Sequence, residues 1–386
     1  MFHYWCGNSV VTLTAAPVVA AAAIVALVAI AAVPATWDRW RRRRAAGRTI
    51  LVLLASIATT LATGLFVNAQ AGFFPTVSSL YSQRTPVNVG QNGVRAALSS
   101  STAVDTAALA SAHQDGHGVV ARIPLDGSRT GLRRTAAIYL PDAYFAPGWE
   151  HVRFPVVEML SGSPGNPSQL LQQLRLGPTL DSLIDQHVMA PTVVVLPDTN
   201  GSPVRDLECV DSAHGIRDDT YLSQEVPASV ATRFRVQAPG SGWAVFGMST
   251  GGYCAVNLAL RHPTQFSVAV SISGYYRPLT DPTTGPLFGS GSALRDANDP
   301  SWRVTNLPVP ASHLWLSAGT GEPTQLRGLR RFAALQRAPL QITTVVLPGG
   351  GHNFSSWRAV LPQALAFVTA NLPAPQAQLA TASWKQ

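Results

Sequence analysis

The sequence of 386 residues is poor in charge and in cysteine. Charged residues make up 12% of it and hydrophobic residues 46%, which is little charge for a wholly soluble protein. We therefore expect the surplus of apolar residues to lie in membrane segments. Three cysteines, with no C-x-x-C pair, are too few for a disulfide-rich scaffold or a cysteine-based zinc site.

Basic charge is also scarce outside one short segment. The chain carries a net charge of +8, and the six arginines and one aspartate of residues 38–48 supply +5 of it, so the rest carries only +3. A nucleic-acid-binding domain shows its basic patch on the domain itself. This distribution argues against nucleic acid as a partner.

Two apolar runs, at about residues 10–33 and 50–70, flank the arginine-rich segment 38–48. A helix over the first run spans about 36 Å, more than the ~30 Å of a membrane hydrocarbon core. Arginine-rich loops stay in the cytoplasm. We therefore predict a membrane anchor over residues 1–72, with two transmembrane helices, a cytoplasmic loop at 38–48 and both chain ends outside. The protein would be a multi-pass protein of the cell membrane with an extracytoplasmic catalytic domain.

The same residues also fit a signal peptide. Residues 41–48 would be its basic segment, residues 50–66 its apolar core and Ala69-Gln70-Ala71 its cleavage site, with the true start after the first run. The protein would then be secreted after cleavage near Ala71. On either interpretation the rest of the chain lies outside the cytoplasm.

Residues 73–118 are rich in Ser, Ala, Thr and Gly without sustained periodicity, so we expect a tether, and we expect a disordered tail at 374–386. Residues 119–373 alternate short apolar runs with helix-length stretches, which predicts an α/β fold with a mostly parallel, doubly wound sheet. Two antiparallel edge strands are expected at 119–123 and 135–140. Parallel strands buried on both faces are expected at 154–160, 192–196, 243–246, 268–272, 314–316 and 342–347. Helices are expected at 168–187, 218–234, 250–261, 325–336 and 357–372.

One G-x-S-x-G pattern, Gly247-Met248-Ser249-Thr250-Gly251, stands between an expected strand and an expected helix. So sharp a turn strains the serine backbone and needs small neighbours on both sides. The turn raises Oγ above the sheet and points the helix N-terminus at it, which favours developing negative charge. We predict that Ser249 is a nucleophile.

A serine hydroxyl needs a base, and in α/β-hydrolases the chain order is Ser, acid, His. Three histidines follow Ser249. His262 ends the next helix, too close in sequence to reach back, and His313 begins a strand at the wrong end of the sheet. His352 follows the last strand in a glycine-rich loop, so we predict that His352 is the base.

The acid must lie between the serine and the histidine, and the candidates there are Asp281, Asp296, Asp299 and Glu322. Glu322 follows an expected strand at the carboxyl edge of the sheet, whereas the aspartates lie in the long insertion 275–307. We prefer Glu322, with Asp296 or Asp299 next, as the residue that orients the imidazole and stabilises its cation.

An oxyanion hole needs two backbone amides aimed at one point. Thr250, directly after the nucleophile, should donate one. The other should come from the loop after an early strand, residues 160–165, where we nominate the Ser163 amide. A plain turn is the alternative for that loop.

Cys209 and Cys254 both fall near the carboxyl edge of the expected sheet. A disulfide between them would close a loop of about 45 residues. Two buried thiols are the alternative.

The pattern resembles the esterase D family, which includes mycolyltransferases and S-formylglutathione hydrolases. The resemblance covers roughly residues 119–372 and rests on the stretches 154–162, 247–253 and 350–354 with Trp357. It implies an α/β-hydrolase fold and ester chemistry on Ser249, Glu322 and His352 without metal or cofactor. The sequence departs from the family at Ser161-Gly162, where the oxyanion loop often reads His-Gly or Asp-Gly, and at Pro323 after the acid.

These residues predict an exported, membrane-anchored serine esterase or acyltransferase that forms an acyl-enzyme on Ser249. Its partner would be an ester or acyl-donor small molecule or a lipid. Aromatic residues in the insertion favour a bulky, partly apolar acyl group, unless they only pack the insertion onto the sheet; they are Tyr275, Tyr276, Phe288 and Trp302. The alternatives are a catalytically silent α/β-hydrolase scaffold and a serine peptidase of the cell envelope.

Overall fold

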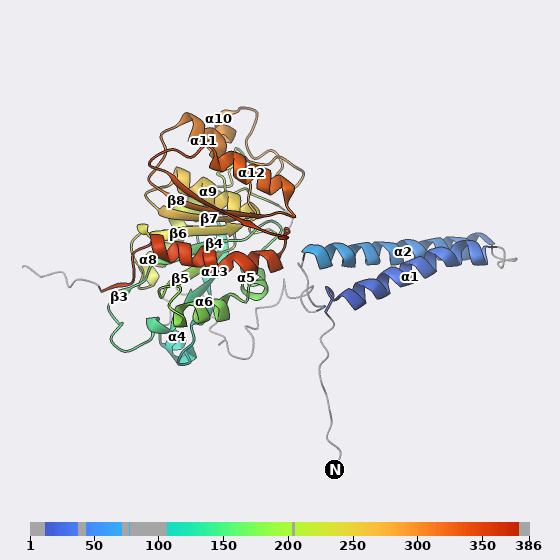
Figure 1. Cartoon of the computed structure of the whole chain (residues 1–386), viewed down its shortest axis with the longest axis horizontal. Coiled ribbons are helices and arrows are strands. Elements are labelled where there is room, and N and C mark those ends of the chain that lie inside the picture. The colour runs from blue at the N-terminus through green and yellow to red at the C-terminus, as the bar shows by residue number, and fades with distance from the viewer. Residues whose placement is uncertain (1–11, 38–43, 72–76, 78–105, 203–204, 378–386) are drawn as a thin grey trace, which may run out of the picture. The chain divides into compact units, whose positions relative to one another are not determined.

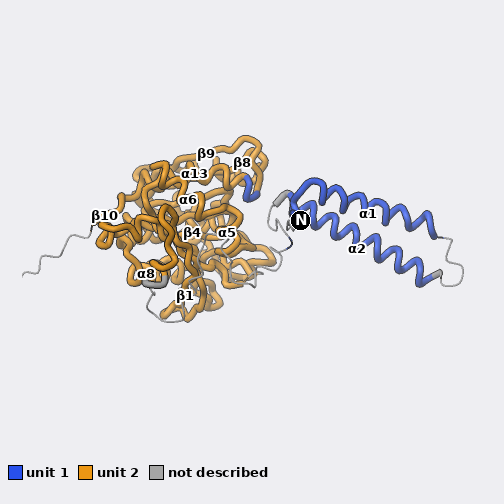
Figure 2. The backbone as a smooth tube through the Cα atoms, turned by 90° about the horizontal axis from the view of Figure 1, so that it is seen from below, with its two compact units in different colours: residues 1–87, 353–355 blue, residues 88–352, 356–386 orange. Residues whose placement is uncertain are grey.

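The computed structural model describes residues 12–37, 44–71, 77, 106–202 and 205–377. The chain divides into two compact units, residues 1–87 with 353–355 and residues 88–352 with 356–386 (Figure 2). Most of the expected basic loop, most of the expected tether and the end of the expected tail lie outside the described residues.

Two long apolar helices, α1 (Ala16–Thr36) and α2 (Arg44–Ala71), make up most of the first unit. They run antiparallel and side by side (Figures 1 and 2). With mean hydropathies of 2.7 and 2.3, both are long and apolar enough to cross a membrane. Large apolar side chains point away from the pair, such as Leu27 and Leu61, which are 66% and 62% exposed.

Both helices begin elsewhere than expected. Pro17 lies in the first turn of α1, where its missing N–H costs no hydrogen bond, so the helix begins at Ala16 and not near residue 10. α2 already begins at Arg44, inside the basic segment, because arginine and alanine are good helix formers.

An eight-stranded sheet in the order β1-β2-β5-β4-β6-β7-β8-β9 forms the centre of the second unit. β2 is antiparallel to β1 and β5, and all other neighbours are parallel, so the predicted α/β-hydrolase fold class is confirmed. The strands are β1 (Val119–Asp126), β2 (Arg133–Leu140), β4 (Val156–Leu160), β5 (Val193–Pro197), β6 (Gly240–Met248), β7 (Phe266–Ile272), β8 (His313–Gly319) and β9 (Gln341–Leu347). β10 (Gln376–Ala377) pairs with β3 (Val152–Arg153), so the domain continues past residue 373.

Helices cover both faces of the sheet (Figure 1). α8 (Val226–Arg233), α9 (Thr250–Arg261) and α12 (Pro323–Ala333) contribute to the large core cluster. α5 (Pro167–Gln173), α6 (Leu176–Asp185) and α13 (Phe354–Asn371) lie together on the other face. The remaining helical segments lie in connections: η1 (Asp142–Tyr144), α7 (Asp218–Thr220), η2 (Tyr221–Glu225), α10 (Ala293–Ala297) and α11 (Pro300–Asn306). The carboxyl ends of β4, β6, β7 and β8 meet at one edge, where a doubly wound sheet carries its sites.

Three expectations about the domain are wrong. Residues 168–187 do not form one helix, because Arg175 has a left-handed backbone (φ 49°) that separates α5 from α6. β9 is not buried on both faces, because it forms the edge of the sheet. The tether does not reach residue 118, because α4 (Thr106–Ala112) packs Leu109 into the core beside β1.

Candidate active site

Ser249 occupies a strained turn between β6 and α9. Its dihedrals are φ 55° and ψ −123°, a region that residues with a side chain rarely adopt. A Cβ on Gly247 would lie 2.0 Å from the Gly251 carbonyl oxygen, and one on Gly251 would lie 2.3 Å from the Leu160 carbonyl oxygen. The G-x-S-x-G spacing is therefore the steric requirement of this turn.

The three side chains predicted to form a triad meet at this turn. His352 Nε2 lies 2.9 Å from Ser249 Oγ, and His352 Nδ1 lies 2.6 Å from Glu322 Oε1. The serine follows β6, the glutamate follows β8 and the histidine follows β9. In this arrangement a histidine can take the serine proton while a carboxylate holds the ring in place.

Glu322 has further donors besides the histidine. The residue is 4% exposed, and its Oε2 accepts hydrogen bonds from Ser273 Oγ at 2.7 Å and from Gly319 N at 3.0 Å. Burial raises the pKa of Glu322, but the hydrogen bonds from His352, Gly319 and Ser273 outweigh it and hold the pKa below the ordinary 4.5. Glu322 is therefore ionised at neutral pH.

Ser273 is a site residue that sequence reasoning missed. It has a left-handed backbone (φ 53°) directly after β7. Its hydroxyl donates to Glu322 and accepts from Trp357 Nε1 at 3.0 Å, and the Trp357 ring meets the His352 ring edge-on with centroids 5.2 Å apart. The one signal in the sequence is its place after an apolar run, which many residues share.

The less favoured candidates are engaged elsewhere. Asp299 caps α11 by accepting from Trp302 N at 2.9 Å, and Asp281 accepts from the amides of its own turn, Thr283 and Thr284. Asp296 lies within α10. His262 lies 2.6 Å from Asp219, and His313 begins β8 at the amino end of the parallel strands.

Of the two residues nominated for the oxyanion hole, Thr250 directly follows Ser249, and Ser163 follows a glycine that lies against it. Thr250 is the first residue of α9, so its amide is among the N–H groups that a helix leaves free at its start. The loop after β4 lies against the turn, because a Cβ on Gly162 would be 3.0 Å from Ser249 Cβ and 3.6 Å from its Oγ. Ser163 is the next residue of that loop.

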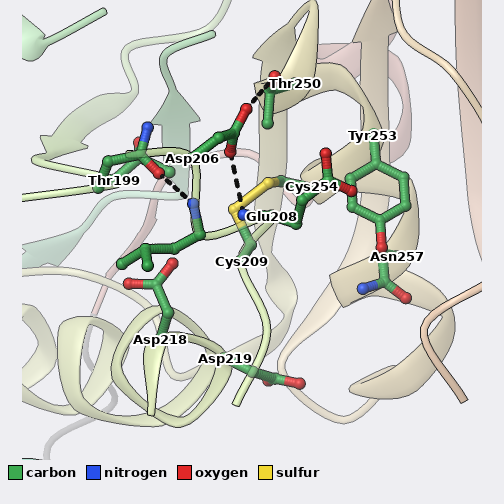
Figure 3. Close-up of a disulfide and its surroundings, with 12 residues drawn as sticks. Thr199, Asp206, Glu208, Cys209, Asp218, Asp219, Thr250, Tyr253, Cys254 and Asn257 are labelled. Carbon is green, nitrogen blue, oxygen red and sulfur yellow. Dashed lines mark hydrogen bonds between the residues drawn. A yellow bond between two sulfur atoms is a disulfide. The ribbon is translucent and has the colours of Figure 1, made fainter. Parts of the chain in front are cut away.

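A group of buried polar residues that sequence reasoning missed lies beside Thr250 (Figure 3). Asp206 Oδ2 accepts a hydrogen bond from Thr250 Oγ1 at 2.9 Å, and Asp206 Oδ1 accepts one from Glu208 N at 3.0 Å. Tyr275 OH donates to Glu208 and lies 3.3 Å from Thr250 Oγ1. Burial raises the pKa of Asp206 and raises that of Glu208 to about 8. Asp206 and Glu208 carry no motif, and the one sequence signal that brings their loop to the nucleophile helix is the predicted disulfide between Cys209 and Cys254.

A disulfide joins Cys209 to Cys254 in the structure, with the Cα atoms 5.6 Å apart (Figure 3). Cys254 is the fifth residue of α9. The bond therefore ties the loop that bears Asp206 and Glu208 to the helix that begins at Thr250.

Three of the four aromatic residues in the insertion pack inward. Tyr275 stacks on Tyr253 and Tyr276 on Phe332, with centroids 4.9 and 4.5 Å apart, and Phe288 joins a small core cluster. Trp302 is 37% exposed. These contacts match the packing alternative, so the aromatic residues give no argument for a bulky acyl group. Among the described residues no three His, Cys, Asp or Glu side chains gather as metal ligands.

Comparison with known proteins gives a family and several relatives. A family model described as "Putative esterase" matches residues 127–368. An uncharacterised protein of Corynebacterium glutamicum is 26% identical over 333 residues, which cover 82% of this chain and 75% of that protein. The diacylglycerol acyltransferase/mycolyltransferase Ag85A of Mycobacterium leprae is 30% identical over 161 residues, 35% of this chain and 47% of the relative. The chain thus matches about half the length of the Ag85 relatives.

Two solved structures share the fold of the second unit. A ferulic acid esterase has a TM-score of 0.57 at 20% identity, over 66% of this chain and 98% of that one. An S-formylglutathione hydrolase from Agrobacterium tumefaciens has a TM-score of 0.57 at 19% identity, over 68% of this chain and 98% of that one. The predicted resemblance to the esterase D family is confirmed. The chain belongs to this esterase family and is a serine hydrolase or acyltransferase with the α/β-hydrolase fold.

Proposed function

We propose that the chain is an exported, membrane-anchored serine esterase or acyltransferase that works through an acyl-enzyme on Ser249. The observation that carries the proposal is the continuous line of hydrogen bonds from Ser249 Oγ through His352 to Glu322, at 2.9 and 2.6 Å. Glu322, ionised at neutral pH, would stabilise the imidazolium that forms when His352 takes the serine proton.

In the proposed reaction, Ser249 Oγ attacks the ester carbonyl carbon while its proton passes to His352 Nε2. The amides of Thr250 and Ser163 donate to the oxyanion of the tetrahedral intermediate. The intermediate collapses, and the alcohol leaves with the proton that His352 returns. Water or a second alcohol then attacks the acyl-enzyme with His352 again as the base, which releases the acid or a new ester.

The test uses a fluorophosphonate probe and para-nitrophenyl esters. We expect the probe to label the peptide that contains Ser249, and Ser249→Ala or His352→Ala to lower kcat by ~10⁴-fold or more without unfolding the protein. His313→Gln, at the other end of the sheet, is the matched control and should keep full turnover. Substantial turnover by folded Ser249→Ala would contradict the assignment. A wild-type protein that neither labels nor turns over ester would be a silent scaffold.

The proposed acyl donor is an apolar ester, and the acceptor is water or an alcohol. The Ag85 relatives support the proposal, because they are named as diacylglycerol acyltransferases and mycolyltransferases. The proposed membrane anchor also supports it, because it would hold the enzyme among lipid esters. We expect faster turnover of medium and long acyl esters than of acetyl ester, and a transfer product with glycerol or a disaccharide, identified by mass. Fastest turnover of acetyl ester without any transfer product would contradict this substrate class.

The proposed anchor is the helix pair α1 and α2 with its basic connection in the cytoplasm. Hydropathy, helix length and the outward-facing apolar side chains support it. A reporter active only outside the cytoplasm should give signal when fused after Gln386 and none when inserted at Ala45. N-terminal sequencing completes the test, because a mature protein that starts at Gly72 would replace the anchor by a cleaved signal peptide.

A further inference from the structure

Asp206 is a buried carboxylate that the proposed triad does not use. The residue is 4% exposed, and both oxygens are engaged, Oδ2 by Thr250 Oγ1 and Oδ1 by Glu208 N (Figure 3). Asp206 thus contacts the side chain of Thr250, one of the two residues that we assign to the oxyanion hole.

The segment that carries Asp206 is itself firmly held. Asp206 N donates to Thr283 O at 3.2 Å, and Leu207 N donates to Asn200 Oδ1 at 3.0 Å. Glu208 and Cys209 both have left-handed backbones, with φ 50° and 51°, and the disulfide follows at once. Because these bonds fix the segment, the Asp206 carboxylate can hold its hydrogen-bond partners in place.

Burying a carboxylate opposes folding, and so does keeping two non-glycine residues at positive φ. Such costs concentrate at functional sites. Thr250 is the first residue of α9, so no hydrogen bond within the helix fixes the direction of its amide. Small shifts in the direction of the amide matter, because an oxyanion hole works through donors that are already in place.

We propose that Asp206 is a positioning residue that fixes the Thr250 amide of the oxyanion hole by accepting a hydrogen bond from the Thr250 side chain. The inference rests on the proposed function of Ser249. Asp206 touches no reacting atom; it acts through Thr250, which it holds. Burial raises the pKa of Asp206 and raises that of its neighbour Glu208 to about 8.

The test compares Asp206→Ala and Asp206→Asn with the wild-type full-length protein. Asp206→Ala removes the contacts with Thr250 Oγ1 and Glu208 N and should lower kcat by ~100-fold, while KM for a para-nitrophenyl ester stays within about twofold. Asp206→Asn keeps one oxygen acceptor and should lower kcat by about 10-fold. The affinity of an alkyl boronic acid, which forms a tetrahedral adduct on Ser249, should fall in parallel with kcat, a change that lost stability alone would not produce.

Thr250 supplies the second half of the test. Thr250→Val keeps the amide and removes the hydroxyl that Asp206 holds, whereas Thr250→Ser keeps both. Thr250→Val should lower kcat, and Thr250→Ser should keep the wild-type kcat. In the double variant Asp206→Ala/Thr250→Val, the loss of kcat should be much smaller than the product of the two single losses. Asp211→Asn is the matched control, because Asp211 lies in the same loop and accepts hydrogen bonds from Thr220 N and Oγ1. It should leave kcat unchanged.

Each outcome decides one question. A folded Asp206→Ala protein with wild-type kcat and boronate affinity, or effects that multiply fully with those of Thr250→Val, would overturn the positioning role and leave the proposed function intact. A wild-type protein without turnover and without fluorophosphonate labelling of Ser249 would overturn the proposed function itself.

Discussion

At the scale of single residues, the contact between Glu322 and His352 makes the sharpest prediction. Glu322→Gln keeps the size of the side chain and an oxygen for Ser273 and Gly319, but its uncharged amide cannot stabilise the imidazolium. We expect kcat to fall by ~10²–10⁴-fold while the thermal midpoint changes little. Steady-state kinetics and a thermal melt measure both. A larger loss in Asp296→Asn or Asp299→Asn would show that the acid lies elsewhere.

Glu158 on β4 is also a buried acidic residue, but it lacks the hydrogen bonds that Glu322 accepts. It is 0% exposed, and neither oxygen has a hydrogen-bond partner among the described residues. Burial raises its pKa well above 4.5, so the folded chain keeps a proton that the unfolded chain loses. The contribution of Glu158 to the free energy of unfolding is therefore greatest below pH 4.5, where both states are protonated. It decreases as the pH rises above 4.5.

Glu158→Gln is accordingly expected to gain stability over the wild-type protein as the pH rises. The variant carries no titrating group at this position, so the difference in thermal midpoint should widen as the pH rises above 4.5. Thermal melts at several pH values measure it. A difference that stays constant over this range would contradict the buried, protonated state.

At the scale of elements, the disulfide ties the β5–α7 loop to α9 by a covalent bond. The two cysteines are 45 residues apart in the sequence. In the chain-entropy model, closing a loop of this length stabilises the fold by ~4 kcal/mol. We expect the Cys209→Ser/Cys254→Ser double variant to lose about that much free energy of unfolding in a urea titration. Alkylation of both thiols in unreduced, denatured wild-type protein would contradict the bond.

The elements differ in how far the sequence predicts them. The strands at the centre of the sheet were predictable because both of their faces are buried, which requires short apolar runs such as residues 243–246 and 268–272. The break at Arg175 and the exposure of β9 were not, because they depend on what lies next to them. Ser249 and His352 follow from motif and chain order, whereas no motif marks Asp206 or Ser273. Their roles depend on partners far away in the sequence.

At the scale of the whole molecule, the second unit has its own core and should fold without the helix pair. A chain of residues 106–386 is expected to be soluble and to keep the kcat of the full protein on a soluble ester. A chain of residues 119–386 lacks Leu109, which is 1% exposed in the core, and should lose ~2–3 kcal/mol of unfolding free energy or more. Urea titrations of both measure this. Equal stability of the two would place α4 outside the folding unit.

The strained backbone of Ser249 lowers the free energy of unfolding of the whole chain. A non-glycine residue held in such a region costs ~1–3 kcal/mol. Both Ser249→Ala and Ser249→Gly remove the hydroxyl, but only glycine adopts φ 55° without strain. We expect Ser249→Gly to unfold at a higher urea concentration than Ser249→Ala, and equal midpoints would show that the turn is unstrained. The residue that we propose as the nucleophile is thus expected to make the protein less durable than its inactive glycine variant.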